Sequence, residues 1–231
     1  MGNKNRQKKR LAKQRLTSGT ANLTRSAPSS RRPAASSSVP ANPQTHGDFW
    51  HGTTTSVLSA DPDFVLAPAR VHGSAQVWTP DTSVSADPAA LHVGDSVALM
   101  FALVASQRLG GQPALAVVRL PGADLEPDPT YLDLIPADAG HRDWRSSYIA
   151  CGRVVYRGTA KPLSRWRCDD VPKLAQRLRD TGLSTQLTEW ANPFAWKPYA
   201  ERLGLGPQVD SPLAFRDVVG KSIFRDCFVQ F

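Results

Sequence analysis

At 231 residues, with 28 Lys and Arg against 20 Asp and Glu, the chain is basic and long enough for one substantial domain plus an appendage, or for two small domains. Residues 1–47 hold ten basic and no acidic residues, residues 48–158 hold seven against twelve, and residues 159–231 hold eleven against eight. The excess positive charge therefore belongs mostly to the N-terminal segment, and a basic groove through the folded part is not indicated.

The cysteines and the apolar runs suggest a cytoplasmic protein. Cys151, Cys168 and Cys227 fit neither a disulfide framework nor a metal site of paired cysteines, so we expect reduced thiols and no metal. The longest apolar run, residues 97–105, is too short to cross a bilayer, and the basic N-terminal segment lacks the apolar core of a signal peptide.

Residues 1–47 have the composition of a disordered basic tail and linker. Seven positive charges fall within residues 2–16, which could form a short helix against nucleic acid or an acidic surface, or could stay solvated. Residues 17–47 are rich in Ser, Thr, Pro, Ala and Asn, with little apolar surface to bury.

Residues 48–158 carry the patterns of a first folded unit. Residues 49–55 (FWHGTTT) predict a strand entering a turn, short strands are expected within residues 57–71, and residues 76–81 predict a strand closed by a proline. An Asp95 cap, the apolar residues 97–105 and the following Gly110 predict a buried helix, and residues 113–120 predict a central strand. Residues 142–156 are expected to be a loop entering one or two strands.

Residues 159–231 predict a small, mainly helical C-terminal region. A helix is expected at residues 171–178 with Gly182 past its end, and two further helical segments are expected at 194–203 and 212–224.

Between the expected central strand and residue 130 stand three carboxylates, and such a cluster between prolines is more often an exposed loop than catalytic apparatus. They are Asp124, Glu126 and Asp128.

Taken in order, three short motifs resemble the His, aromatic, acidic signature of the ADP-ribosyltransferase superfamily. They are residues 51–53 (HGT), 77–79 (VWT) and 125–129 (LEPDP). The chain is most similar to the compact rifamycin ADP-ribosyltransferase type, and residues 145–148 (RSSY) are similar to that family's Arg-Ser-Tyr stretch. The resemblance covers roughly residues 49–157 and implies an α+β fold with a split β-sheet core and few helices.

The resemblance also implies a set of site residues, with NAD as the substrate that donates ADP-ribose. His51 would bind the adenine-side ribose of NAD, the Gly52 backbone would meet the nicotinamide carboxamide, and Asp128 would lie near the nicotinamide ribose. Trp78 takes the position of the family's tyrosine against the nicotinamide ring, which keeps the stacking face but loses the phenol. Glu126 and Asp124 remain rivals of Asp128, because other branches of the superfamily use glutamate there. The implied catalytic set is His51, Trp78 and Asp128, and the implied NAD-binding set is His51, Gly52, Thr53, Trp78 and Tyr148.

These residue types suit the cleavage of a nicotinamide glycosidic bond. The ribose develops positive charge as this bond breaks, so a fixed carboxylate stabilises the transition state more than the ground state. An aromatic face attracts the cationic pyridinium ring. We therefore expect an NAD-dependent mono-ADP-ribosyltransferase, and the basic tail suggests a macromolecular acceptor, either protein or nucleic acid.

Three alternatives stay open. The acceptor could be a small molecule of the rifamycin type. The chain could instead belong to the RNA 2′-phosphotransferase branch of the same superfamily, although the acidic balance of residues 48–158 argues against a phosphate-binding pocket. Finally, it could be a non-enzymatic nucleic-acid-associated protein that uses its basic tail.

Overall fold

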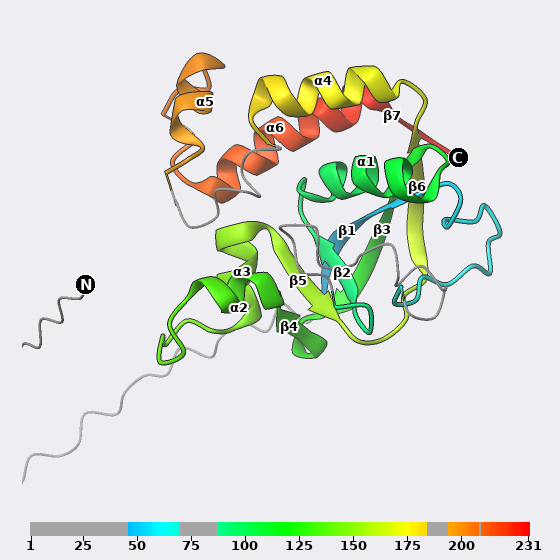
Figure 1. Cartoon of the computed structure of the whole chain (residues 1–231), viewed down its shortest axis with the longest axis horizontal. Coiled ribbons are helices and arrows are strands. Elements are labelled where there is room, and N and C mark those ends of the chain that lie inside the picture. Colours follow the sequence, from blue (N-terminus) through cyan, green and yellow to red (C-terminus); the bar gives the residue numbers. More distant parts are fainter. Residues whose placement is uncertain (1–45, 70–86, 184–193, 208) are drawn as a thin grey trace, which may run out of the picture. The chain divides into compact units, whose positions relative to one another are not determined.

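A seven-stranded antiparallel sheet forms the centre of the computed structural model, which describes residues 46–69, 87–183, 194–207 and 209–231 (Figure 1). The strands lie in the spatial order β4, β5, β2, β1, β3, β6, β7. In chain order their bounds are His46–Thr54 (β1), Leu91–Gly94 (β2), Pro113–Pro121 (β3), Leu125–Pro127 (β4), Arg153–Tyr156 (β5), Pro162–Cys168 (β6) and Phe228–Gln230 (β7).

Six α-helices accompany the sheet in the described residues, which confirms the expected mixed α+β class. α1 packs against β1 and β3, while α4 and α6 lie side by side over α1 (Figure 1). α2 and α3 contact each other, and α3 packs beside β4 and β5. The bounds are Ala98–Leu109 (α1), Pro129–Leu134 (α2), Trp144–Cys151 (α3), Val171–Thr181 (α4), Lys197–Arg202 (α5) and Pro212–Cys227 (α6).

α1 and the central strands lie where the sequence predicts them. β1 pairs with β3 along its whole length, from His46 opposite Pro121 to Thr54 opposite Pro113. α1 begins after Asp95, whose Oδ1 accepts a hydrogen bond from the Val97 amide at 3.1 Å, and it ends at Gly110 with φ of 74°. Cap, apolar body and terminal glycine together specified this helix.

Gly52 allows α1 to lie directly on β1. A Cβ atom at this position would stand 2.1 Å from the Ala98 carbonyl oxygen and 2.7 Å from the Ala102 amide nitrogen. Only glycine permits that approach of backbone to backbone. Ala98 and Ala102 are themselves buried and small, so the helix and strand meet without a layer of long side chains.

Two local expectations from the sequence were wrong. Residues 144–151, expected as part of a loop and strand, form α3, because Asp143 Oδ1 caps the amides of Arg145 and Ser146 and Gly152 ends the helix with φ of 71°. Residues 55–69 contain no strand of the sheet, and only an isolated bridge pairs Leu66 with Ala160. The strand expected at residues 76–81 lies outside the described residues.

The sheet also continues past residue 158, where the sequence suggests a boundary. β6 pairs with the central strand β3, and β7 pairs with β6. The C-terminal region holds α4, α5 and α6 besides these two strands. The apolar faces of α4 and α6 bury the same core as α1, so this region completes the sheet and its cover. That shared core includes Leu99, Leu174, Leu178, Phe215 and Ile223.

A buried ion pair fastens α6 to the turn between β2 and α1. Arg216 Nε donates to Asp95 Oδ2 at 2.7 Å, and both side chains are buried or nearly so. Ser96 Oγ donates to the Arg216 carbonyl at 2.7 Å. Gly220, one turn further along α6, lies so close that an added Cβ would stand 1.9 Å from Ser96 Cβ.

Three cysteines are free thiols, each buried, and none of the helices in the described part of the chain has the length and apolar character that a bilayer span requires. The described residues also contain no group of three or more His, Cys, Asp or Glu side chains placed to share a metal ion.

The contact between Gly220 and Ser96 makes Gly220→Ala a test of how α6 is seated. Alanine favours a helix over glycine by about 1 kcal/mol, but the clash with Ser96 demands a shift of α6, which costs about 1–3 kcal/mol in a packed core. We expect the clash to prevail and the free energy of unfolding in urea to fall. Gly140→Ala is the matched control, because a Cβ there meets nothing within 4 Å. Equal stability of the two variants would contradict this packing.

Candidate functional site

β1 and β2 are neighbours in the sheet, and we call the short ladder between them the split. It contains a single register pair, Trp50 opposite Gly94. Beyond it, the His51 imidazole spans the gap, and its Nδ1 donates a hydrogen bond to the His92 carbonyl oxygen at 2.8 Å. A side-chain hydrogen bond therefore joins β1 and β2 next to their single ladder pair.

A cavity of about 80 Å³ lies in this split. One ordered water needs only about 10–15 Å³, so the space can hold a larger group. Its walls are mostly apolar, with Trp50 and Phe101 as aromatic walls and a few polar groups between them. The polar side chains that line it are His51, Asp87, His92 and Arg153.

Asp128 lies directly behind two of these lining residues. It begins α2, where Oδ1 accepts a hydrogen bond from the Thr130 amide at 3.0 Å. Oδ2 accepts a short hydrogen bond from Arg153 Nη2 and lies 3.3 Å from His92 Nδ1. The Asp128 side chain has 0% exposure and does not line the cavity. Its charge therefore reaches the cavity through Arg153 and His92.

The charge state of His92 decides which neighbour it bonds. Nε2 lies 3.2 Å from the Asp87 carbonyl oxygen and must donate to it. Nδ1 lies 3.1 Å from Arg153 Nη2 and 3.3 Å from Asp128 Oδ2. The neutral ring accepts from Arg153 at Nδ1, whereas the protonated ring can only donate to Asp128. One imidazole thus links the arginine and the carboxylate in two alternative ways.

Burial and charge act against each other at Asp128. Burial by itself would raise the pKa of the Asp128 carboxyl group, but the His92 hydrogen bond and the positive charge of Arg153 outweigh it and hold the pKa below its usual value. Arg153 in turn is only 2% exposed, and its guanidinium lies over the Phe101 ring, 4.4 Å from the ring centroid. The cavity wall therefore carries a compensated ion pair instead of a bare charge.

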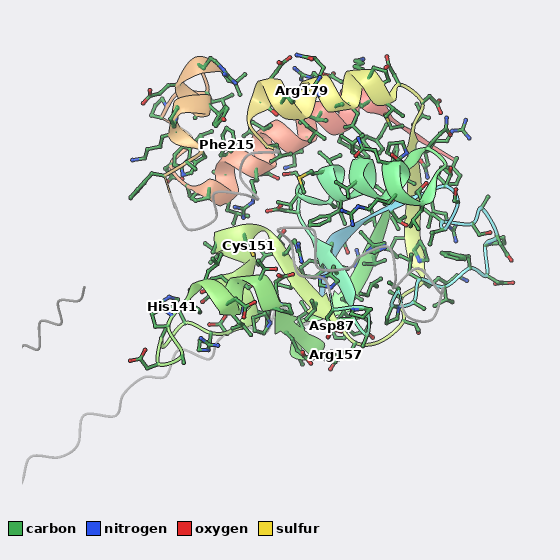
Figure 2. The ribbon with its side chains drawn as sticks, in the orientation of Figure 1. Asp87, His141, Cys151, Arg157, Arg179 and Phe215 are labelled. Carbon is green, nitrogen blue, oxygen red and sulfur yellow. The ribbon has the colours of Figure 1, made fainter. Side chains whose placement is uncertain are left out.

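The three rival carboxylates are separated by the structure. Asp124 and Glu126 are exposed. Glu126 accepts from Arg157 Nε at 3.0 Å, and the same arginine reaches Asp87 Oδ2 at 2.9 Å on the rim of the sheet (Figure 2). Of the three, Asp128 alone contacts residues that line the cavity.

The other site residues expected from the sequence fall in three places. His51 and Gly52 line the cavity. Thr53 is buried in β1, and Tyr148 packs on α3 with its ring edge-to-face against Phe49 at 5.7 Å between centroids; neither lines the cavity. Trp78 lies outside the described residues.

Sequence reasoning missed His92 and Arg153. His92 lies on the four-residue strand β2, before the turn that leads into α1, and Arg153 is the first residue of β5, after the glycine that ends α3. In both cases the available signal was a lone histidine or arginine in a mostly apolar strand next to the end of a helix.

No family model matches the chain, and neither a curated protein nor a solved structure matches it.

The Asp128–Arg153 pair predicts a pH-dependent loss of stability in Asp128→Asn. Because the folded-state pKa of Asp128 is lowered, its ionised form stabilises the fold above the unfolded-state pKa of about 3.9, and this contribution is lost as the pH falls through the folded-state value. At pH 7 the variant leaves the buried Arg153 facing an amide, which lowers the free energy of unfolding by about 3–5 kcal/mol. The gap between parent and variant should narrow below about pH 3.9.

Urea unfolding at several pH values measures this gap. Asp48→Asn serves as the control, because Asp48 pairs with Arg119 at 2.7 Å but both side chains are about half exposed, at 49% and 57%. Its loss should be much smaller, since exposed pairs contribute little. A comparable loss in both variants, or a gap independent of pH, would argue against the buried pair.

Proposed function

We propose that the folded part of this chain transfers ADP-ribose from NAD to an acceptor. One observation carries the proposal: residues from two separate motifs of the sequence, His51 and Asp128, both contact His92. The His51 side chain donates from Nδ1 to the His92 carbonyl oxygen, and Asp128 Oδ2 lies 3.3 Å from the His92 imidazole Nδ1. His51 and His92 line the cavity together with Gly52, and Asp128 lies behind His92.

The cavity suits a flat, weakly polar group with a positive charge nearby. Trp50 and Phe101 supply aromatic walls, and the Gly52 backbone and the imidazoles of His51 and His92 add polar groups to the lining. A nicotinamide ring with its carboxamide has this chemistry. In the resemblance the middle, aromatic position of the His, aromatic, acidic order belongs to Trp78, and we keep that assignment in the proposal.

Asp128 would act on the substrate indirectly, without contacting it. Its carboxylate is covered by Arg153 and His92, so its negative charge orients these two groups and offsets the positive charge of Arg153. As the ribose becomes cationic on losing nicotinamide, a neutralised wall opposes that charge less than a bare arginine would. The Asp128 carboxylate thus supports the reaction electrostatically, across the short distance that Arg153 and His92 occupy.

The tail supports a macromolecular acceptor. Ten basic and no acidic residues in positions 1–47 provide a polycation that a small acceptor does not require. The same charge pattern favours the second candidate function, a non-enzymatic protein that associates with nucleic acid. We place the reaction in the cytoplasm, consistent with three free, buried thiols.

Release of nicotinamide from NAD tests the enzymatic proposal. We expect His51→Ala and His92→Ala each to lower the release rate by about 100-fold, because both hold the ligand in its reacting geometry. His141→Ala is the matched control, since His141 is exposed and lies on a loop away from the cavity (Figure 2). Chromatography of the reaction follows nicotinamide, and circular dichroism checks that each variant folds. No release by the parent protein would leave the non-enzymatic candidate; equal loss in all three variants would remove His51 and His92 from the site.

Deletion of residues 1–45 tests the acceptor. NAD turnover should change little, because the cavity residues all follow this segment, whereas modification of a macromolecular acceptor at physiological salt should fall sharply. Binding of the full chain to nucleic acid should weaken with salt, with a log–log slope of about −0.7 to −0.9 per phosphate contact. Mass spectrometry of modified products decides between acceptors. Undiminished modification by the shortened chain, or efficient modification of rifampicin, would favour a small-molecule acceptor.

A further inference from the structure

Ser147 connects the backbones of the two residues that form the buried ion pair. It lies on α3 with no exposed surface. Its Oγ accepts a hydrogen bond from the Asp128 amide at 3.0 Å and donates one to the Arg153 carbonyl oxygen at 2.8 Å. One hydroxyl therefore ties together the start of α2, the start of β5 and the middle of α3.

These two bonds replace the next step of a β-ladder. β4 and β5 pair in antiparallel register from Leu125 opposite Tyr156 to Pro127 opposite Val154. The following pair in that register would be Asp128 opposite Arg153, but there the amide and the carbonyl are joined through the Ser147 hydroxyl. A regular ladder joins such groups by a single N–H···O bond, so the inserted hydroxyl sets the strands further apart.

We infer that Ser147 is the positioning residue of the site, because it fixes the backbone positions from which Asp128 and Arg153 reach each other beside the cavity. What the ion pair does in catalysis rests on the proposed function. The geometry by which Ser147 positions Asp128 and Arg153 does not depend on that function. Side-chain rotamers then determine where the carboxylate and the guanidinium lie, and His92 completes the contact.

The Cys151 side chain lies next to the Ser147 hydroxyl. Cys151 Sγ lies 3.6 Å from Ser147 Oγ and donates to the Ser147 carbonyl at 3.0 Å, so the thiol packs behind the hydroxyl. Burial is the main cause that raises the pKa of the Cys151 thiol, which keeps it neutral at neutral pH. Among the described residues, His92 and Arg153 lower the pKa of the Asp128 carboxyl group, and the Asp128 charge in turn helps to raise the pKa of Cys151.

Ser147→Ala tests the inference through the titration of Asp128, followed by NMR of the aspartate carboxyl carbons. Without the hydroxyl, the pair loses its alignment, and the Asp128 midpoint should move up towards its usual value. Ser106→Ala is the matched control: Ser106 is also buried on a helix, but its hydroxyl donates to the Leu103 carbonyl of its own helix at 2.8 Å. The control should leave the Asp128 midpoint where the parent has it. An unchanged midpoint in Ser147→Ala would overturn the inference.

Ser147→Thr keeps the hydroxyl and decides the case if the alanine variant does not fold. A parent-like midpoint in the threonine variant supports the role of the hydroxyl, and a midpoint shifted upward in it contradicts that role. In a nicotinamide-release assay we expect Ser147→Ala to lower kcat by about 10- to 100-fold while the KM for NAD changes by less than about twofold. If the parent releases no nicotinamide, the proposed function fails, and the NMR titration still decides the positioning role.

Discussion

The ion pair between Arg216 and Asp95 connects α6 to the turn between β2 and α1. Besides its 2.7 Å bond to Asp95, Arg216 donates through Nη2 to the carbonyl oxygens of Tyr148 and Ile149 at 2.9 and 3.0 Å. A cation at the C-terminal end of α3 is favourable, because the last carbonyl oxygens of a helix carry partial negative charge and the outermost of them lack partners within the helix. One side chain from α6 therefore fixes the turn after β2 and the end of α3, the two elements that lead to His92 and to Arg153. A buried arginine without these partners would be strongly unfavourable, so the C-terminal helix and the site depend on each other.

The same principle recurs at the cavity. Each buried charge near the split has a partner of opposite sign or a set of backbone groups: Arg153 with Asp128, Arg216 with Asp95, and Asp128 with the Thr130 amide. Because every member is paired, the region can be both dry and polar, which strengthens electrostatic effects on whatever occupies the cavity. Removing one side chain of either ion pair leaves the other buried and charged.

Long apolar patterns with clear ends were predictable from the sequence, and pairings between distant segments were not. α1, β3 and α4 each combined a periodic or continuous apolar run with a cap, a proline or a glycine, and they lie where those signals placed them. α3 has only eight residues with two serines, so its Asp143 cap and Gly152 end carried the whole signal. Nothing local indicates that Trp166 pairs with Gln230, which is what brings β7 into the sheet. At the site, His51 and Asp128 were singled out by motif order, but the burial of Asp128 depends on Arg153, which arrives on a later strand.

The two outermost strands of the sheet are its shortest in the described residues. β4 and β7 have three residues each, and β4 ends in Pro127, which has no backbone N–H to donate. An edge this brief offers a neighbouring chain too few backbone groups for stable pairing, which is one way that natural sheets avoid edge-to-edge aggregation. Both edges of the sheet in the described residues therefore offer a second copy of the chain little backbone for strand addition.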